Sequence, residues 1–299
     1  MKVIRAEILG FCMGVRRAVD MAGAAANSGA ASGRVFTLGP LIHNPQVLAG
    51  LEKQGVEILD ERKLFLDSAE PGAAVVIRAH GVPPALEKEL TGRGVRLIDA
   101  TCPRVKASQL KAKALAESGH CLFLAGEKEH AELIGVQGYA AAARPGGAPS
   151  CIVVGGAAEA EAAAERLRAD VPAARTALIG QTTISEEEYR EISNGIKKYF
   201  PDLEVVHTIC GATRDRQEAL RKLLDRVDAV IVAGGRESAN TRRLFAIARE
   251  RGKPCWLSES AADLPPEIFS FQTVGLCAGA STPDDVIDGI EGALKRGRI

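Results

Sequence analysis

The amino-acid sequence predicts an α/β protein built from three repeated units with parallel sheets. Two observations predict this fold: short apolar or β-branched runs alternate with Ala-, Glu- and Arg-rich stretches, and similar loops recur at similar spacings. Strands that alternate with helices form parallel sheets with helices on both faces. In such sheets, ligands bind where strands end and loops enter helices. We therefore expect the functional residues in the strand-to-helix loops.

The individual elements follow from local patterns. The runs typical of strands are 2–8, Val35–Leu38, Val56–Leu59, Ala74–Arg78, Val95–Asp99, Cys121–Ala125, Cys151–Val154, Ala177–Gly180, Glu204–His207, Ala229–Ala233, Cys255–Leu257 and Thr273–Cys277. The clearest helical patterns are Val15–Ala26, Arg104–Glu117, Ala158–Ala169, Glu186–Tyr199, Gln217–Val227 and Ser238–Arg249. Apolar runs of four to eight residues suit buried strands, whereas the longer mixed stretches suit helices.

Composition narrows the class of protein. At 299 residues the chain exceeds what one hydrophobic core usually serves. Its 38 basic and 38 acidic residues balance, so we expect no nucleic-acid or membrane partner attracted by net charge. No window of about 18 apolar residues is present, and the charged start is unlike a signal peptide. Seven cysteines in such a chain indicate reduced thiols and a cytoplasmic location.

Three cysteines share one setting, directly after a predicted strand and before a helix: Cys12, Cys102 and Cys210. A second polar loop follows each cysteine after 31, 28 and 30 residues, at His43, His130 and Asn240. A third follows after 68, 80 and 71 residues, at His80, Thr182 and Ser281. This spacing predicts three copies of one α/β unit of about 100 residues. We place them at residues 1–96, 97–195 and 196–299, and expect the loops to converge on one cavity.

The shared setting favours metal binding by these three cysteines. A cysteine taken singly is usually a small buried hydrophobe, which is our interpretation of the other four, Cys121, Cys151, Cys255 and Cys277. A helix N-terminus favours the thiolate, which is the metal-binding form. Three thiolates with one open position suit either a zinc ion with a water or a 4Fe–4S cluster with one iron open to substrate. Because three thiolates make zinc weakly electrophilic, the cluster is favoured.

The other loop residues suit a small anionic substrate. Histidines recur at matching positions, and further polar residues stand near helix starts: His43, His80, His130, Thr182, Ser238, Asn240 and Ser281. Helix N-termini bind phosphate oxygens, although serine and threonine there also act as plain caps. A diphosphate is therefore the expected ligand group. Glu132 lies two residues after His130, and burial in a cavity closed to water would raise its pKa and let it deliver a proton.

Seven ordered motifs carry a resemblance to a known family. They are Gly10-Phe11-Cys12-Met13-Gly14-Val15, Gly39-Pro40-Leu41-Ile42-His43-Asn44-Pro45, Arg78-Ala79-His80-Gly81-Val82, Asp99-Ala100-Thr101-Cys102-Pro103, Gln181-Thr182-Thr183, Thr208-Ile209-Cys210 and Ala278-Gly279-Ala280-Ser281. Across its whole length the chain resembles the 4-hydroxy-3-methylbut-2-enyl diphosphate reductases. This resemblance implies a trefoil of three α/β domains around a central 4Fe–4S cluster.

The resemblance also implies residue roles. It implies that Cys12, Cys102 and Cys210 bind iron and that Glu132 donates the proton. It implies that the substrate is held by His43, His80, His130, Thr182, Ser238, Ala239, Asn240 and Ser281. The implied reaction is a two-electron reductive dehydroxylation that gives isopentenyl and dimethylallyl diphosphates, the last step of the methylerythritol phosphate route to isoprenoids. Because no nicotinamide-binding motif is present, we expect a ferredoxin or flavodoxin as electron donor.

Two positions depart from the family pattern, and two other functions remain open. Ala131 stands where the family usually has proline, and Ala239 stands where it often has serine. Neither change touches an expected cluster ligand, and the backbone N–H of Ala239 remains a donor. The alternatives are a hydro-lyase that uses the open iron only as a Lewis acid, and a non-catalytic Fe–S sensor of a metabolite.

Overall fold

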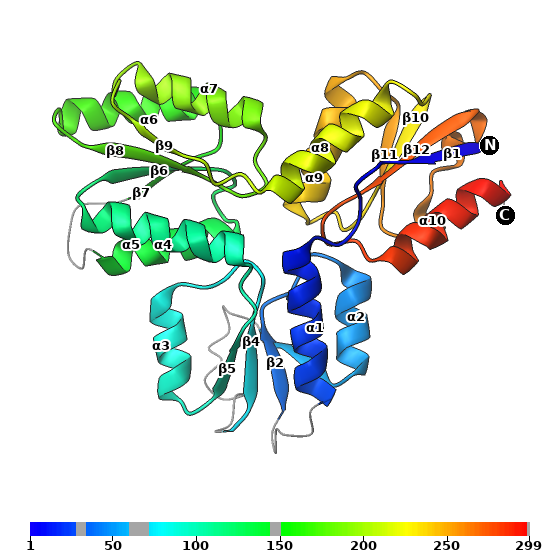
Figure 1. The fold of residues 1–299 in the computed structure, drawn as a ribbon, viewed down its shortest axis with the longest axis horizontal. Coiled ribbons are helices and arrows are strands. Elements are labelled where there is room, and N and C mark those ends of the chain that lie inside the picture. The colour runs from blue at the N-terminus through cyan, green and yellow to red at the C-terminus, as the bar shows by residue number, and fades with distance from the viewer. Residues whose placement is uncertain (28–33, 60–71, 144–150, 298–299) are drawn as a thin grey trace. The chain divides into compact units, whose positions relative to one another are not determined.

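The computed structural model describes residues 1–27, 34–59, 72–143 and 151–297. These residues form three four-stranded sheets, in which all pairings are parallel, and ten α-helices (Figure 1). The chain divides into two compact units: residues 1–20, 40–55 and 211–299 form unit 1, and residues 21–39 and 56–210 form unit 2. The predicted α/β class with three α/β parts is confirmed. The boundaries 1–96, 97–195 and 196–299, and the trefoil arrangement, stay predictions.

Unit 1 contains one sheet. Its strand order is β1 (Lys2–Arg5), β12 (Thr273–Ala278), β10 (Ala229–Ala233) and β11 (Cys255–Ser258). Its other elements include α2 (Pro45–Lys53), α8 (Gly211–Leu224), α9 (Ala239–Glu250), α10 (Asp284–Arg296) and the 3₁₀ turns η2 (Ala261–Asp263) and η3 (Pro266–Ser270). Successive side chains of β10 point to opposite faces. Val232 therefore packs against α8 and α9, and Ile231 packs against α10 and η3.

Unit 2 contains two sheets. The first has the order β3 (Val56–Leu59), β2 (Val35–Leu38), β4 (Ala74–Ile77) and β5 (Arg96–Asp99). The second has the order β7 (Cys151–Val154), β6 (Cys121–Ala125), β8 (Thr176–Gly180) and β9 (Glu204–Val206). The helices are α3 (Pro84–Gly92), α4 (Pro103–Glu117), α5 (Ala131–Ala143), α6 (Ala157–Asp170) and α7 (Glu186–Lys197), while α1 (Met13–Asn27) runs from unit 1 into unit 2.

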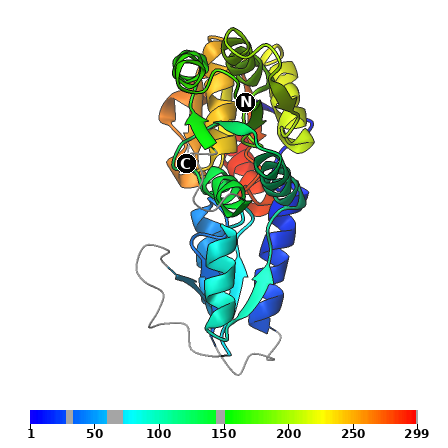
Figure 2. The same cartoon turned by 90° about the vertical axis from the view of Figure 1, so that its left-hand side faces the viewer.

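Alternating side chains cover both faces of the second sheet in unit 2. Leu122 and Leu124 pack against α4 and α5, whereas Phe123 packs against α6 and α7. On the first sheet, Leu90 of α3 joins the core that Phe36 and the other strand residues build, and Figure 2 shows this cyan helix lying over the sheet. Packing on both faces holds the strands in place, and the loops at the strand ends are therefore attached to a rigid sheet.

Every predicted strand and helix overlaps an observed one, and two of them differ by three residues or more at a bound. Five predicted strands have the observed bounds, among them Val35–Leu38 and Ala229–Ala233. The first strand ends at Arg5, short of the predicted residue 8. Helix α8 begins at Gly211, six residues before the predicted Gln217. The prediction started too late because the first turns of the helix are polar and lack the apolar pattern that indicates a helix in a sequence. Among the described residues, no helix is both long enough and apolar enough to cross a membrane.

One strand order is repeated in all three sheets. Each sheet begins at one edge with the strand that leads to a cysteine: β1, β5 or β9. The next strand, β12, β4 or β8, leads to a loop with Ser281, His80 or Thr182. The third strand, β10, β2 or β6, leads to a loop with Asn240, His43 or His130. The repeat predicted from spacing thus has a counterpart in the topology of the sheets.

Candidate functional site

The three cysteines of the repeat lie at equivalent points of the three sheets. Cys12 directly precedes α1, Cys102 is the N-cap residue of α4, and Cys210 directly precedes α8. All three are half-buried. The predicted setting, after a strand and before a helix, is therefore confirmed for each. A helix start exposes backbone N–H groups that have no partner within the helix.

The backbone anchors each cysteine loop in the same way. The N–H of Cys12 donates to the carbonyl of Ala280 at 3.0 Å, that of Cys102 to Ala79 at 2.9 Å, and that of Cys210 to Thr182 at 3.0 Å. Each acceptor belongs to the loop that follows the neighbouring strand, so in every sheet a cysteine is joined to one of the predicted substrate loops. This joining follows from parallel pairing, because neighbouring parallel strands end at the same edge of the sheet.

Glu132 and Thr182 form a buried pair in unit 2. Glu132, the second residue of α5, is 2% exposed. The Thr182 N–H donates to Glu132 Oε1 at 2.7 Å, and the Thr182 hydroxyl lies 2.8 Å from Oε2. Burial raises the pKa of Glu132 to about 7, and the two hydrogen bonds from Thr182 oppose part of that rise. At neutral pH this carboxyl group is thus poised between its protonated and ionised forms.

Two of the predicted histidines lie against each other beside this pair. The rings of His80 and His130 are nearly perpendicular, with centroids 5.0 Å apart. The Glu132 N–H donates to His130 Nδ1 at 3.2 Å. In a neutral imidazole an Nδ1 that accepts a hydrogen bond leaves the proton on Nε2. The structure therefore brings His80, His130, Glu132 and Thr182 together at the carboxyl ends of the strands in unit 2.

In unit 1, uncharged hydrogen-bonding side chains lie together in the loops after β10 and β12. Ser238 is the N-cap residue of α9, and its side chain accepts from the Thr241 N–H at 3.4 Å. The Ser281 hydroxyl is 3.3 Å from Ser238 Oγ and 3.4 Å from the carbonyl oxygen of His43. Gly235 lies so close to His43 that an added Cβ would be 2.3 Å from the same carbonyl oxygen. Only glycine fits there, so the loops that carry Ser281, Ser238 and His43 are packed together.

Asn240 adds an unsatisfied amide to this group. Its side chain is 4% exposed, and neither its amide nitrogen nor its amide oxygen has a hydrogen-bond partner among the described residues. A buried polar atom without a partner costs about 1–3 kcal/mol. Together with the start of α9, at Ala239, this amide provides donors that suit the oxygens of an anionic ligand.

The cysteine loops fit a sulfur-ligated metal group in their chemistry. Three half-buried thiols form a soft donor set, which suits iron–sulfur clusters and zinc. Cys12 Sγ also accepts from the Val15 N–H at 3.5 Å, and such N–H···S bonds tune cluster potentials. The meeting of all three thiols at one cluster stays a prediction.

Sequence reasoning missed one residue of the site. The Gln181 side chain, 2% exposed, accepts from the Glu127 N–H at 3.0 Å and donates to the Thr183 hydroxyl at 3.0 Å. It therefore ties the loop before His130 to the loop of Thr182. The one signal in the sequence was its place next to two threonines, which does not reveal a contact across 54 residues.

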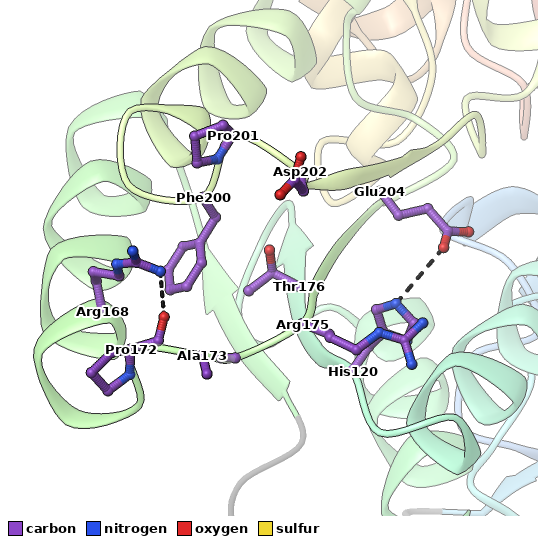
Figure 3. A pocket seen from close by; sticks show the side chains of 11 residues that line it. His120, Arg168, Pro172, Ala173, Arg175, Thr176, Phe200, Pro201, Asp202 and Glu204 are labelled. Atoms are coloured by element: carbon purple, nitrogen blue, oxygen red, sulfur yellow. Dashed lines mark hydrogen bonds and ion pairs between the residues drawn. The ribbon is translucent and has the colours of Figure 1, made fainter.

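A separate cavity of about 430 Å³ lies at the other end of the second sheet of unit 2 (Figure 3). It is found where β8 and β9 begin, and Arg168, Phe200 and Glu204 are among its lining residues. Arg168 donates to the carbonyl of Pro172, and His120 Nε2 lies 3.9 Å from Glu204. Ligands of parallel sheets bind at the carboxyl ends of strands, so this cavity at their amino ends is not the candidate site.

Comparisons with known proteins agree with the resemblance seen in the motifs. The family model described as LytB protein matches residues 3–295. A 4-hydroxy-3-methylbut-2-enyl diphosphate reductase from Treponema denticola is 47% identical over 304 residues, which cover 99% of this chain and all of the relative. The reductase of that name from Aquifex aeolicus is 39% identical over 294 residues, covering 98% of this chain and 96% of the relative.

Solved structures give the same result. The (E)-1-hydroxy-2-methyl-but-2-enyl-4-diphosphate reductase of Plasmodium falciparum superposes with a TM-score of 0.86 at 25% identity, over 97% of this chain and 87% of that one. A structure described as (E)-4-hydroxy-3-methyl-but-2-enyl diphosphate reductase, the terminal enzyme of the non-mevalonate pathway, gives a TM-score of 0.70 at 38% identity. It covers 99% of this chain and 100% of that one.

Proposed function

The chain belongs to the LytB protein family, and we propose from this membership that it reduces 4-hydroxy-3-methylbut-2-enyl diphosphate. The allylic C–O bond breaks, the oxygen leaves as water, and a new C–H bond forms at either end of the allyl group. Two electrons and two protons enter for each product molecule of isopentenyl or dimethylallyl diphosphate. The full-length match to the family carries this proposal, and the buried Glu132–Thr182 pair supports it, because a carboxyl with a pKa of about 7 can deliver a proton.

Cys12, Cys102 and Cys210 would hold a 4Fe–4S cluster in this enzyme. Their common place at helix starts, half-buried, supports that assignment. A bound cluster of this kind would supply single electrons and an open coordination position at one iron. We assign no ligand role to the other cysteines: Cys277, for example, is fully buried, and burial raises the pKa of its thiol to about 12.

The diphosphate would bind the neutral donors of unit 1. Ser238, Asn240 and Ser281 offer side-chain donors, and Ala239 offers a backbone N–H at the start of α9. Neutral donors and a helix dipole bind phosphate oxygens without requiring a change of protonation. We assign His43, from the adjoining loop, to the same task.

Proton delivery would belong to unit 2. In its protonated form, Glu132 donates from Oε2 to the Thr182 oxygen 2.8 Å away, and the Thr182 hydroxyl then passes its own proton to the departing oxygen. His80 and His130, which flank the pair, would hold and orient the hydroxyl end of the substrate. Because Glu132 is 2% exposed, water competes little for this proton.

Electrons would come from a ferredoxin or flavodoxin, since the chain carries no nicotinamide-binding motif. We place the enzyme in the cytoplasm, where thiols stay reduced. Both assignments come from the sequence and the chemistry of the reaction.

The decisive experiment is anaerobic purification, followed by iron and sulfide analysis, EPR of the reduced protein and turnover assays with and without dithionite-reduced viologen. We expect about four irons and four sulfides per chain and turnover only with the reductant. Cys12→Ser, Cys102→Ser and Cys210→Ser should each lose cluster and activity. Cys121→Ser, a matched control at the first residue of β6, should keep both.

The same experiment separates the two alternatives. Turnover without reductant would indicate a hydro-lyase. A cluster whose spectrum responds to the diphosphate substrate, in a protein that never turns over, would indicate a sensor. Zinc in place of iron would contradict the proposed function.

A further inference from the structure

The buried Arg216 of α8 holds the loop that carries Cys12. Its side chain is 4% exposed, and its guanidinium donates through NH2 to the carbonyl of Gly10 at 2.6 Å. A second bond runs from NH1 to the carbonyl of Ala212 at 2.8 Å, within α8 itself. The guanidinium group of Arg216 thus joins α8 to Gly10, which lies 206 positions earlier in the chain and two residues before Cys12.

The Gly10 carbonyl needs such a partner. Gly10 is buried, so its carbonyl oxygen is costly to leave without a hydrogen bond. Its φ is +79°, a left-handed conformation that glycine adopts without strain, and an added Cβ would lie 2.9 Å from Ile287 Cδ1. Sterics therefore fix the shape of this turn, and Arg216 fixes the direction of its carbonyl group.

The other two cysteine loops have backbone anchors of their own, although the bond from Arg216 to Ala212 lies two residues after Cys210. The loop of Cys102 is fixed by Asp99, whose Oδ1 accepts from the Thr101 N–H at 2.9 Å. The N–H of Cys210 donates to the carbonyl of Thr182. A change at Arg216 that acts through the turn at Gly10 should therefore affect Cys12 more than Cys102 or Cys210.

We propose that Arg216 is a positioning residue for Cys12: its guanidinium fork holds the Gly10–Cys12 turn so that the thiol is presented for ligation. The inference rests on the proposed function in one respect, that Cys12 is a cluster ligand. The geometry of the fork is the active feature. A lysine keeps the charge but cannot span the two carbonyl groups in one rigid arrangement.

The test compares Arg216→Gln and Arg216→Lys with the control Arg214→Gln, on the same helix, where the side chain is 61% exposed. The readout is the alkylation rate of each cysteine in the cluster-free protein, followed by mass spectrometry. A hydrogen bond to a charged group is worth about 1.5–3 kcal/mol, so Cys12 should react roughly 10- to 100-fold faster in both Arg216 variants. Cys102 should react at its wild-type rate, any change at Cys210 should be smaller than the change at Cys12, and the control should match wild type throughout.

Three outcomes would overturn the inference. An unchanged Cys12 rate would show that Arg216 does not hold the turn. Equal acceleration at all three cysteines would show general loosening of the fold. A wild-type Cys12 rate in Arg216→Lys alone would show that charge suffices. Because the measurement uses cluster-free protein, it remains informative if the proposed function fails.

A second arm connects the turn to ligation in the reconstituted holoprotein. Release of iron to a chelator should be faster in both Arg216 variants than in wild type or Arg214→Gln. Faster alkylation of Cys12 with wild-type iron release would contradict the ligation part of the inference. If no variant binds a cluster and wild type also binds none, the proposed function fails while the alkylation result still decides the role of Arg216.

Discussion

Equivalent loops of two sheets carry opposite kinds of chemistry. In unit 2 the loops after β6 and β8 pair a buried carboxyl, Glu132, with Thr182. In unit 1 the corresponding loops after β10 and β12 pair two hydroxyls, Ser238 and Ser281, beside a buried amide. Because the strand order is the same, the difference between the two sites arises from the residues that these loops and helix starts carry.

This difference indicates that units with the same strand order can perform different parts of one reaction. A carboxyl with a pKa of about 7 changes charge near neutral pH and can move a proton. Hydroxyls, an amide and a helix start do not titrate in that range, so these donors keep the same charge across it. Changes in unit 2 should therefore alter rate and pH dependence, whereas changes in unit 1 should alter substrate affinity.

The largest expected effect is that of Glu132→Gln. The amide keeps the shape of the side chain but has no acidic proton, so kcat should fall about 100- to 10,000-fold. Iron content and the EPR spectrum should match wild type. The control is Glu129→Gln, an exposed glutamate in the same loop, which should keep wild-type kcat. A Glu132→Gln enzyme with kcat within twofold of wild type would remove the proposed proton donor.

Glu132 should also make folding stability depend on pH. The folded-state pKa of about 7 lies above the ordinary glutamate pKa of 4.5, so between these two pH values the folded protein holds a proton that the unfolded chain has lost. Stability is then greatest below pH 4.5 and falls as the pH rises to about 7, by about 3 kcal/mol in total. Urea unfolding of cluster-free wild type and Glu132→Gln, compared at several pH values, measures this term as their difference. A difference that does not change with pH would contradict it.

Thr182→Val should lower kcat, because the hydroxyl that passes the proton is removed, and it should shift the pH profile of the activity that remains. The reaction needs protonated Glu132, so kcat/KM of wild type should fall as the pH rises through about 7. The Thr182 hydroxyl lowers the pKa of Glu132, and its removal should move that midpoint upward by about one to two units. The control Thr183→Val lies in the same loop and should keep the wild-type midpoint. A downward shift in Thr182→Val would contradict the assignment.

Ser281→Ala should weaken substrate binding with little change in rate. A hydrogen bond to a charged ligand is worth about 1.5–3 kcal/mol, so KM should rise roughly 10- to 100-fold while kcat stays within a few-fold of wild type. Ser270→Ala is the matched control in unit 1, because the exposed Ser270 lies before β12, whereas Ser281 follows the carboxyl end of that strand. A fall in kcat without a change in KM would indicate that Ser281 takes part in proton delivery. It would contradict the assignment of substrate binding to unit 1 and proton delivery to unit 2.

Local patterns predicted much of this arrangement, and long-range pairings did not follow from them. Apolar runs located the strands, and the alternation with helices placed the cysteines at helix starts. Nothing local shows that β1 pairs with β12, because residues near the two ends of the chain form that pair. Thr182 and Glu132 are likewise 50 residues apart. Which strands are neighbours decides both contacts.

Buried polar residues were the hardest to predict. Arg216 lies in the polar run Thr213–Arg216, which is typical of a solvated surface, yet its side chain is 4% exposed. Its partner is the carbonyl of Gly10, and a backbone acceptor leaves no mark in the sequence. Gln181 was missed for the same reason, since it accepts from the N–H of Glu127.

The smallest expected effect comes from restoring a family residue at Ala131. Ala131 is the first residue of α5, the helix position that tolerates proline best because its N–H has no partner within the helix. Ala131→Pro should therefore stabilise the protein by about 0.4–1 kcal/mol, through a less flexible unfolded chain. Urea unfolding at pH 7 measures this, with Ala157→Pro at the equivalent position of α6 as the control. If Ala131→Pro also raises kcat while Ala157→Pro does not, the rigid start of α5 helps to aim Glu132, one residue further on. A loss of stability would show that the turn at His130 needs the N–H of Ala131.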